Sequence, residues 1–175
     1  MKKTITTYGL IAGAIIAGVV ALGLAFETST EHLAALEWLG YAVMIIAFSM
    51  IFVAIKGYRD RELGGVIRFG TAFGVGIGVT LVASVIYVVA WEINLAITDY
   101  AFMEEYTQSL IAAETAAGAS DAELAALQAD MDIMKERYSN PLFRVPMTLL
   151  EIFPVGLLIS LISAAVLRNS NVLPA

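Results

Sequence analysis

The chain has 175 residues, of which 59% are hydrophobic and only 15% are charged, and its net charge is −6. An ordinary soluble domain has about 25% charged residues, so this composition excludes a typical water-soluble globular domain. The sequence contains no cysteine, which excludes disulfides and thiolate metal sites, and its acidic balance argues against nucleic acid as a partner.

Four apolar stretches, each about 20 residues long, indicate membrane-spanning helices. They cover residues 8–26, 33–55, 69–91 and 146–167. Each is long enough to cross a hydrocarbon core about 30 Å thick at a rise of about 1.5 Å per residue. The only charged residues inside them are Glu37 and Glu151, and Glu92 directly follows the third stretch. We therefore expect an all-α integral membrane four-helix bundle in a single domain, residues 1–175.

The first stretch admits two interpretations. Lys2 and Lys3 followed by an apolar run are typical of a secretory signal peptide, but this run is longer than the usual apolar region of about 7 to 15 residues. Small residues also recur at every fourth position: Gly9, Gly13, Ala17 and Ala21. Such a stripe allows another helix to pack closely. We expect a retained helix.

The third stretch carries a small-residue stripe and a polar stripe. At about 100° per residue, Gly70, Gly74 and Gly78 fall close to one line with Glu92, which predicts that this line faces another helix. The polar stripe comprises Thr80, Ser84, Tyr87, Trp91 and Asn94. Polar side chains in hydrocarbon usually join helices, so joining is the favoured interpretation and lining a wet crevice is the alternative.

Residues 99–140 predict a helical hairpin outside the membrane. The third helix is expected to continue past Asp99, because no glycine interrupts it between Gly78 and Gly118. Ser120 and Glu123 form a capping box that starts a second helix. Apolar residues with spacings of three and four form matching seams: Met103, Tyr106, Leu110, Ala113 and Ala117, then Leu124, Leu127, Met131, Met134 and Tyr138. Matching seams joined by a short turn indicate antiparallel helices.

The distribution of basic residues predicts the orientation. Seven of the ten Lys and Arg flank one side of the four stretches: Lys2, Lys3, Lys56, Arg59, Arg61, Arg68 and Arg168. Three lie on the other side: Lys135, Arg137 and Arg144. The positive-inside rule therefore places both termini in the cytoplasm and the hairpin in the periplasm. Twelve of the sixteen acidic residues lie at or beyond the outer boundary, which argues against an anionic lipid surface as a partner there.

Four segments of the chain resemble a known family. They are GGVIRFG at 64–70, ASVIYVVAW at 83–91, NPLFR at 140–144 and LEIFPVGLLISLIS at 150–163. The chain resembles, over nearly its whole length, a bacterial membrane family known as a domain of unknown function (DUF 4199). The resemblance implies a four-span protein of the bacterial inner membrane, and it implies no activity.

Glu151 is the first candidate functional residue. It lies about one and a half turns inside the boundary set by Pro146, where an ionised group costs a few kcal/mol unless it is paired, hydrated or protonated. Arg144 lies on nearly the same helix face about 10 Å away and is a possible ion-pair partner. Pro154 would leave the carbonyl of Leu150 without its usual donor. A structural contact is the favoured role of Glu151, and a proton or cation site is the alternative. Glu92, near the interface, is the second candidate carboxylate.

Two other motifs have simpler explanations. The GVGIG run at 74–78 resembles part of a phosphate loop, but it lies inside an apolar span and lacks a following lysine. His32 is the only histidine, so a histidine pair for a metal site is missing. We expect no metal site, no cofactor and no catalytic residue, and hence a protein that is not an enzyme.

These features predict a non-catalytic structural or regulatory component of the bacterial inner membrane. It would lie in the lipid bilayer and bind a protein partner, or a second copy of itself, through its helix faces and hairpin, and it would not bind nucleic acid. The alternative is a small oligomeric proton- or cation-coupled carrier or channel that uses Glu151 and Glu92. Buried, satisfied carboxylates would favour the first function, and carboxylates bordering an open cavity would favour the second.

Overall fold

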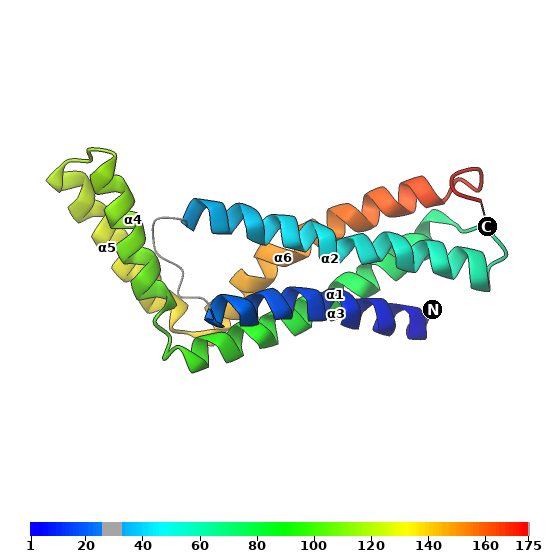
Figure 1. Cartoon of the computed structure of the whole chain (residues 1–175), viewed down its shortest axis with the longest axis horizontal. Coiled ribbons are helices and arrows are strands. Elements are labelled where there is room, and N and C mark those ends of the chain that lie inside the picture. Colours follow the sequence, from blue (N-terminus) through cyan, green and yellow to red (C-terminus); the bar gives the residue numbers. More distant parts are fainter. Residues whose placement is uncertain (26–32, 175) are drawn as a thin grey trace.

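The computed structural model describes the backbone of residues 1–25 and 33–174 and the side chains of residues 1–22 and 38–174. His32 lies outside the described residues. The described chain is all helical (Figure 1), and its helices are α1 Lys2–Ala25, α2 Leu33–Glu62, α3 Phe69–Ile97, α4 Phe102–Ala116, α5 Asp121–Tyr138 and α6 Pro141–Leu167.

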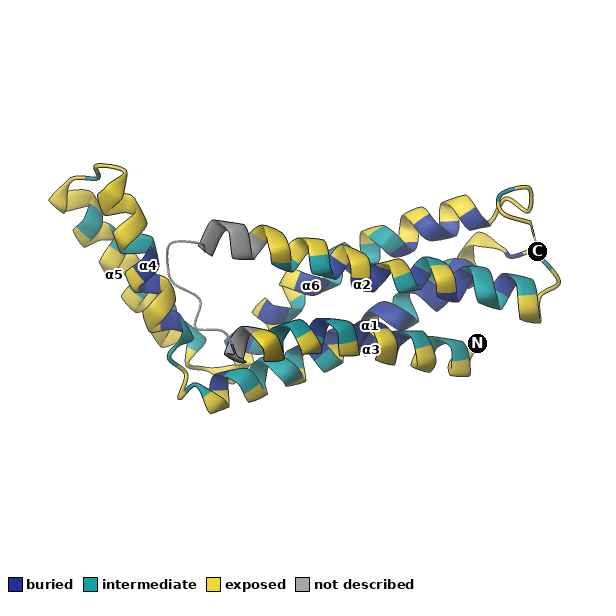
Figure 2. Cartoon of the chain, viewed as in Figure 1, coloured by how far each residue is buried: buried dark blue, intermediate teal, exposed yellow. Residues whose placement is uncertain are grey.

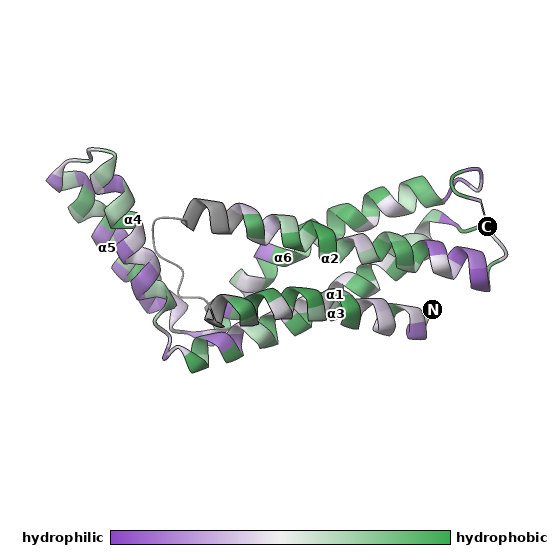
Figure 3. Ribbon diagram, viewed as in Figure 1, coloured by the Kyte–Doolittle hydropathy of each residue, from purple (hydrophilic) through white to green (hydrophobic). Residues whose placement is uncertain are grey.

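Four of these helices are long and apolar enough to cross a membrane. The candidate spans are Lys2–Leu22, Trp38–Glu62, Phe69–Ile97 and Pro141–Leu167. Figure 3 shows hydrophobic residues along α1, α2, α3 and α6, whereas α4 and α5 carry many hydrophilic ones. The fold confirms the expected class, a membrane four-helix bundle with a projecting helical hairpin.

The four long helices pack side by side. α3 packs most extensively against α1 and α6, and α2 packs against both α6 and α1. The two termini and the turn between α2 and α3 lie at one end of the bundle, and the α4–α5 hairpin projects from the other (Figure 1). This arrangement suits a chain that crosses a membrane an even number of times.

Large apolar side chains fill the centre of the bundle. Phe48, Ile51 and Ile55 of α2, Val75 of α3 and Ile152 of α6 have no exposed surface. Figure 2 shows the buried positions on the facing sides of the helices and the exposed positions on the outside. Close packing of this kind leaves little room for solvent between helices.

Several glycines stand where two helices approach closely. A Cβ atom at Gly9 would lie 2.6 Å from Val82, and one at Gly13 would lie 2.4 Å from Ile86. A Cβ at Gly78 would lie 2.6 Å from Ile5. These three glycines therefore bring α1 and α3 together, as small residues do in other membrane helices.

The expectation for the other two glycines of the stripe differs from the structure. A Cβ atom at Gly70 or Gly74 would meet nothing within 4 Å, so neither supports packing within the chain. The close contacts between α3 and α6 involve two glycines outside the stripe. A Cβ at Gly76 would lie 2.8 Å from Ser160, and one at Gly156 would lie 2.4 Å from Thr80. α3 is thus packed on the faces that carry Gly78 and Gly76.

At the end of the bundle that holds the termini, Arg59 joins α2 to the last residues of the chain. Its side chain is fully buried. The guanidinium donates to the carbonyls of Leu167 at 3.3 Å, Val172 at 3.0 Å and Leu173 at 2.5 Å, and its Nε donates to Asp60 at 2.7 Å. The buried charge is therefore paired and hydrogen-bonded, which a buried arginine requires.

The hairpin begins with a tight turn rather than a continued helix. α3 ends at Ile97, and Asp99 and Tyr100 have positive φ angles of 49° and 59°, so the expectation that the helix runs past Asp99 is wrong. Two successive left-handed non-glycine residues are costly. Their surroundings must hold them in place.

The rest of the hairpin follows the expected pattern in part. Ser120 and Glu123 form the capping box, and Gly118 has a positive φ of 89°. On α5 the predicted seam residues are half-buried, whereas every other α5 residue is exposed. On α4 the buried residues include Met103 and Thr107, while the predicted seam members Tyr106, Ala113 and Ala117 are exposed. The face of α4 that packs against its neighbours therefore differs from the predicted seam.

Candidate functional site

Arg144 forms the centre of a buried polar site where the hairpin meets the bundle. Pro141 opens α6, and Asn140 caps it by accepting from the backbone N–H of Leu142. Arg144 therefore lies in the first turn of α6, and only 2% of its side chain is exposed. Its Nε donates to Oε1 of Glu92 at 2.8 Å, and its Nη2 donates to Oε2 at 2.6 Å. This forked geometry is the strongest form of arginine–carboxylate contact.

The same guanidinium contacts the corner between α5 and α6. Its Nη1 donates to the carbonyl of Tyr138 at 2.9 Å and to that of Ser139 at 3.4 Å. The guanidinium carbon lies 5.3 Å from the ring centre of Tyr100 and 5.7 Å from that of Tyr138. One side chain thus contacts α3, the strained turn after it, and the end of α5.

Aromatic side chains surround the ion pair. Trp91 Nε1 donates to the hydroxyl of Tyr138 at 2.7 Å. The ring of Phe102 meets Trp91 edge to face, with centroids 4.9 Å apart, and lies 6.1 Å from Tyr138. Burial raises the pKa of Tyr138, so its hydroxyl stays neutral. This aromatic cluster shields the ion pair and joins α3, α4 and α5.

The expected partner of Arg144 was Glu151, and the structure gives this role to Glu92. Sequence spacing along one helix suggested Glu151, seven residues away. The arginine instead extends across to α3, where Glu92 lies at the same end of the bundle. One feature of the sequence could have indicated the Glu92–Arg144 pair. Both residues lie near the ends of their spans that adjoin the hairpin, so their depths in the membrane match.

Glu151 makes a different contact between the same two helices. Tyr87 on α3, which is only 6% exposed, donates its hydroxyl to Oε2 of Glu151 at 3.2 Å. Glu151 itself is exposed on the surface of α6. The two candidate carboxylates therefore bind separate partners, and the structure does not bring them together in a shared ion pair.

A third polar contact lies deeper in the bundle. The hydroxyls of Thr80 and Ser160 lie 3.2 Å apart, and either can donate to the other. The hydroxyl that accepts in this contact donates its own proton to a carbonyl of its own helix, at Gly76 or Gly156. Ser84 is buried between this pair and Tyr87, and its hydroxyl has no hydrogen-bond partner among the described residues. Thr80, Ser84 and Tyr87 belong to the predicted polar stripe, and two of them bond to α6.

We call these contacts the α3–α6 seam: Glu92–Arg144, Tyr87–Glu151 and Thr80–Ser160. Interhelical polar contacts in membranes contribute about 0.6 kcal/mol each on average. Removing one partner of a buried ion pair destabilises a protein far more than replacing both partners by apolar residues. The seam attaches α3 to α6, because its charged and hydroxyl groups are bonded to one another. Among the described residues, no three His, Cys, Asp or Glu come together in a group that would hold a metal ion.

The fold and the seam define the class of this protein as a multi-pass α-helical membrane protein. A family model described as "Protein of unknown function (DUF4199)" matches residues 7–169. The chain belongs to this family, which confirms the resemblance seen in its sequence. No curated protein and no solved structure matches the chain.

Proposed function

We propose that this protein is a non-catalytic structural or regulatory component of the bacterial inner membrane, and that its hairpin is a docking arm for a protein partner. The observation that carries this proposal is the position of Arg144. Its contacts with Glu92, Tyr100 and the end of α5 fix the hairpin to the bundle at its base. A fixed base gives a projecting arm a defined direction relative to the membrane.

The surface of the arm supports the same function. No residue of α5 is buried, so nearly its whole outer surface is available to a partner. Lys135 forms an ion pair with Glu104 of α4 across the hairpin, which leaves the outer surface predominantly acidic. We expect a partner with a basic surface, because complementary charge guides association.

The orientation of the chain is part of this proposal. Both termini lie at the end of the bundle that carries the basic residues, and the positive-inside rule assigns that end to the cytoplasm. Alkaline phosphatase fused after Arg61 should be inactive, and phosphatase fused at Gly118 should be active. Activity from the fusion at Arg61 would reverse the orientation.

A photocrosslinking amino acid at Ala129, which is exposed on α5, tests the docking function in native membranes. We expect one discrete crosslinked protein whose mass differs from that of a second tagged copy. The same substitution combined with Arg144→Met should lose that product, because the arm would no longer have a fixed direction. Crosslinking only to lipid would exclude the docking function, and equal yields with and without Arg144 would exclude Arg144 as the residue that fixes the arm.

Proton- or cation-coupled transport is the second candidate, and one observation favours it. Glu151 is exposed on α6 within the span Pro141–Leu167, where an ionisable group is costly unless it serves a function. The packed centre of the bundle supports the non-transporting function instead.

Reconstituted vesicles separate the two functions. We expect the wild type to give no proton or cation flux, and we expect Glu151→Gln to fold with little change, because Gln still accepts from Tyr87. Flux in the wild type that disappears in Glu151→Gln would establish the carrier.

A further inference from the structure

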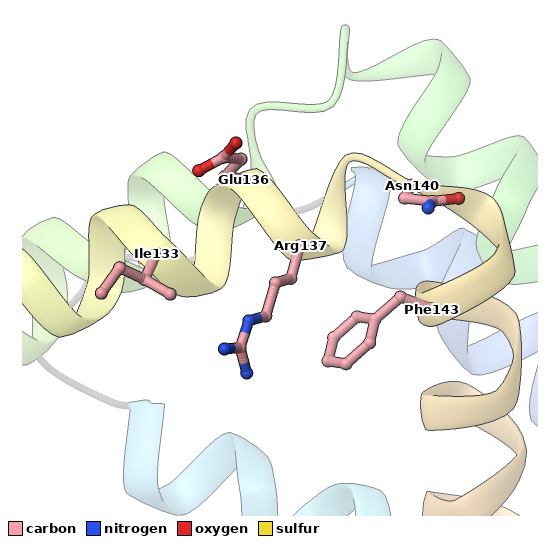
Figure 4. A pocket seen from close by; sticks show the side chains of 5 residues that line it. All are labelled: Ile133, Glu136, Arg137, Asn140 and Phe143. Atoms are coloured by element: carbon pink, nitrogen blue, oxygen red, sulfur yellow. The ribbon is translucent and has the colours of Figure 1, made fainter.

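An open depression of about 650 Å³ lies under the base of the hairpin. Its lining residues are Ile133, Glu136, Arg137, Asn140 and Phe143. Figure 4 shows the side chains of Arg137 and Phe143 pointing into the same open corner, while Glu136 points away from it. The corner therefore combines a cation with an aromatic wall.

Arg137 is the basic residue without an ion pair among the described side chains on this side of the bundle. Of the three basic residues at the outer end, Lys135 is paired with Glu104 and Arg144 with Glu92. Arg137 makes no ion pair with any residue that the structure describes. Its guanidinium is exposed, and with respect to the described side chains all its donors remain for a ligand.

The depression lies at the level of the lipid headgroups. Phe143 is the third residue of the span that begins at Pro141, so Arg137 stands just outside the hydrocarbon. Trp38 lies near the start of α2 and Trp91 near the end of α3, and these two helix ends lie at the same end of the bundle (Figure 1). Tryptophans concentrate at the membrane–water interface. An arginine at this depth faces phosphates rather than acyl chains.

We propose that Arg137 and Phe143 form a binding site for the phosphodiester of one membrane phospholipid. The guanidinium fork matches two phosphate oxygens, and Phe143 with the exposed Ile133 provides apolar surface for the glycerol and the upper acyl chain. The predominantly acidic hairpin disfavours a broad anionic surface, but the depression requires only a single phosphate. The site is independent of the docking function, because it faces the membrane under the arm.

Native mass spectrometry of the purified full chain tests this site. The probe is palmitoyl-oleoyl phosphatidylglycerol, and dioleoylglycerol, which lacks the phosphate, is the comparison lipid. We expect the wild type to retain one phosphatidylglycerol and no dioleoylglycerol. Arg137→Gln should lower the bound fraction about fivefold, the effect of one arginine near a headgroup.

Lys135→Gln is the matched control. It also removes one positive charge, two residues from Arg137, but the Lys135 side chain is already paired with Glu104. It should retain the lipid, and Arg137→Lys should retain part of it. Circular dichroism of each variant checks that the helices are intact. Equal retention in wild type and Arg137→Gln would overturn the proposal, and so would full displacement of the lipid by millimolar inorganic phosphate, which would indicate a site for a free anion.

Discussion

Thr80, Ser160 and Arg144 of the α3–α6 seam are almost fully buried, whereas no residue of α5 in the hairpin is buried. Both regions are pairs of helices, of 29 and 27 residues in the seam and of 15 and 18 residues in the hairpin. The seam is held by polar contacts in which at least one partner is buried, and by glycines that allow close approach. The hairpin is held by an exposed ion pair, by half-buried side chains on α5 and by a few buried residues near the base of α4, so we expect its stability to depend on its base. From this comparison we expect the membrane region to be the scaffold and the hairpin to be the dependent part.

The strongest test of this difference is to remove the hairpin from its base. The excised peptide 99–140 should be mostly unfolded, because isolated short helices are marginal in water and its seam contains several alanines. Its far-ultraviolet circular dichroism should show little helix at any peptide concentration. A strongly helical spectrum that is independent of concentration would mean that the hairpin is a self-sufficient unit.

Arg144→Met should destabilise the whole protein by about 3 kcal/mol, because it leaves the carboxylate of Glu92 without its partner. Unfolding in mixed micelles measures this effect. The double variant Glu92→Gln with Arg144→Met should recover part of the loss, and comparison of the double variant with both single variants gives the coupling energy of the pair. If the single and double variants are equally unstable, the ion pair does not explain the attachment.

A methyl group added in the seam should lower the free energy of unfolding by less than Arg144→Met does. Gly156→Ala places a carbon 2.4 Å from the Thr80 side chain, so α3 and α6 must separate at a cost of about 2 kcal/mol. Gly74→Ala is the matched control, because its new carbon meets open space, and it should be neutral or stabilising by about 0.5 kcal/mol. A loss at Gly74 similar to that at Gly156 would indicate that the Gly74 face packs against a second chain.

The smallest effect concerns the ion pair of the hairpin. The hydrogen bond from Lys135 lowers the pKa of Glu104 below its ordinary 4.5. The ionised Glu104 therefore stabilises the folded hairpin above that pH, and this stabilisation is lost on acidification. The contact with Glu104 raises the pKa of Lys135 above 10.5, so its contribution is present below that pH and is lost in alkali. The pair is therefore complete roughly between pH 5 and pH 10.

Hydrogen exchange of the α4 and α5 amides should show a slight loss of protection outside that pH range. Lys135→Gln should remove this pH dependence. Glu105→Gln, which removes a neighbouring carboxylate, should leave it in place. An unchanged pH profile in Lys135→Gln would assign the effect to another group.

Much of the fold followed from local patterns. Four long apolar stretches predicted four membrane helices, and the capping box at Ser120 and Glu123 predicted the start of α5. The turn at Asp99 and Tyr100 was not predicted, because neither residue favours a left-handed backbone strongly enough to indicate a turn from the sequence. Contacts of Arg144 with Tyr100 and the chain near it stabilise this turn, and those contacts join residues far apart in the sequence.

The sequence by itself determined that this protein lies in a membrane, because the length and hydrophobicity of a span are properties of one segment. It also identified Glu151 as unusual, because charge inside a span is costly, and it identified Glu92 and Arg144 as charges at the ends of spans. Only the tertiary structure decided that Arg144 bonds to Glu92, that Tyr87 bonds to Glu151, and that Gly76 and Gly156 rather than Gly70 and Gly74 meet a neighbour. The physical reason is that these contacts depend on the rotation and depth of one helix relative to another, which many side chains set together.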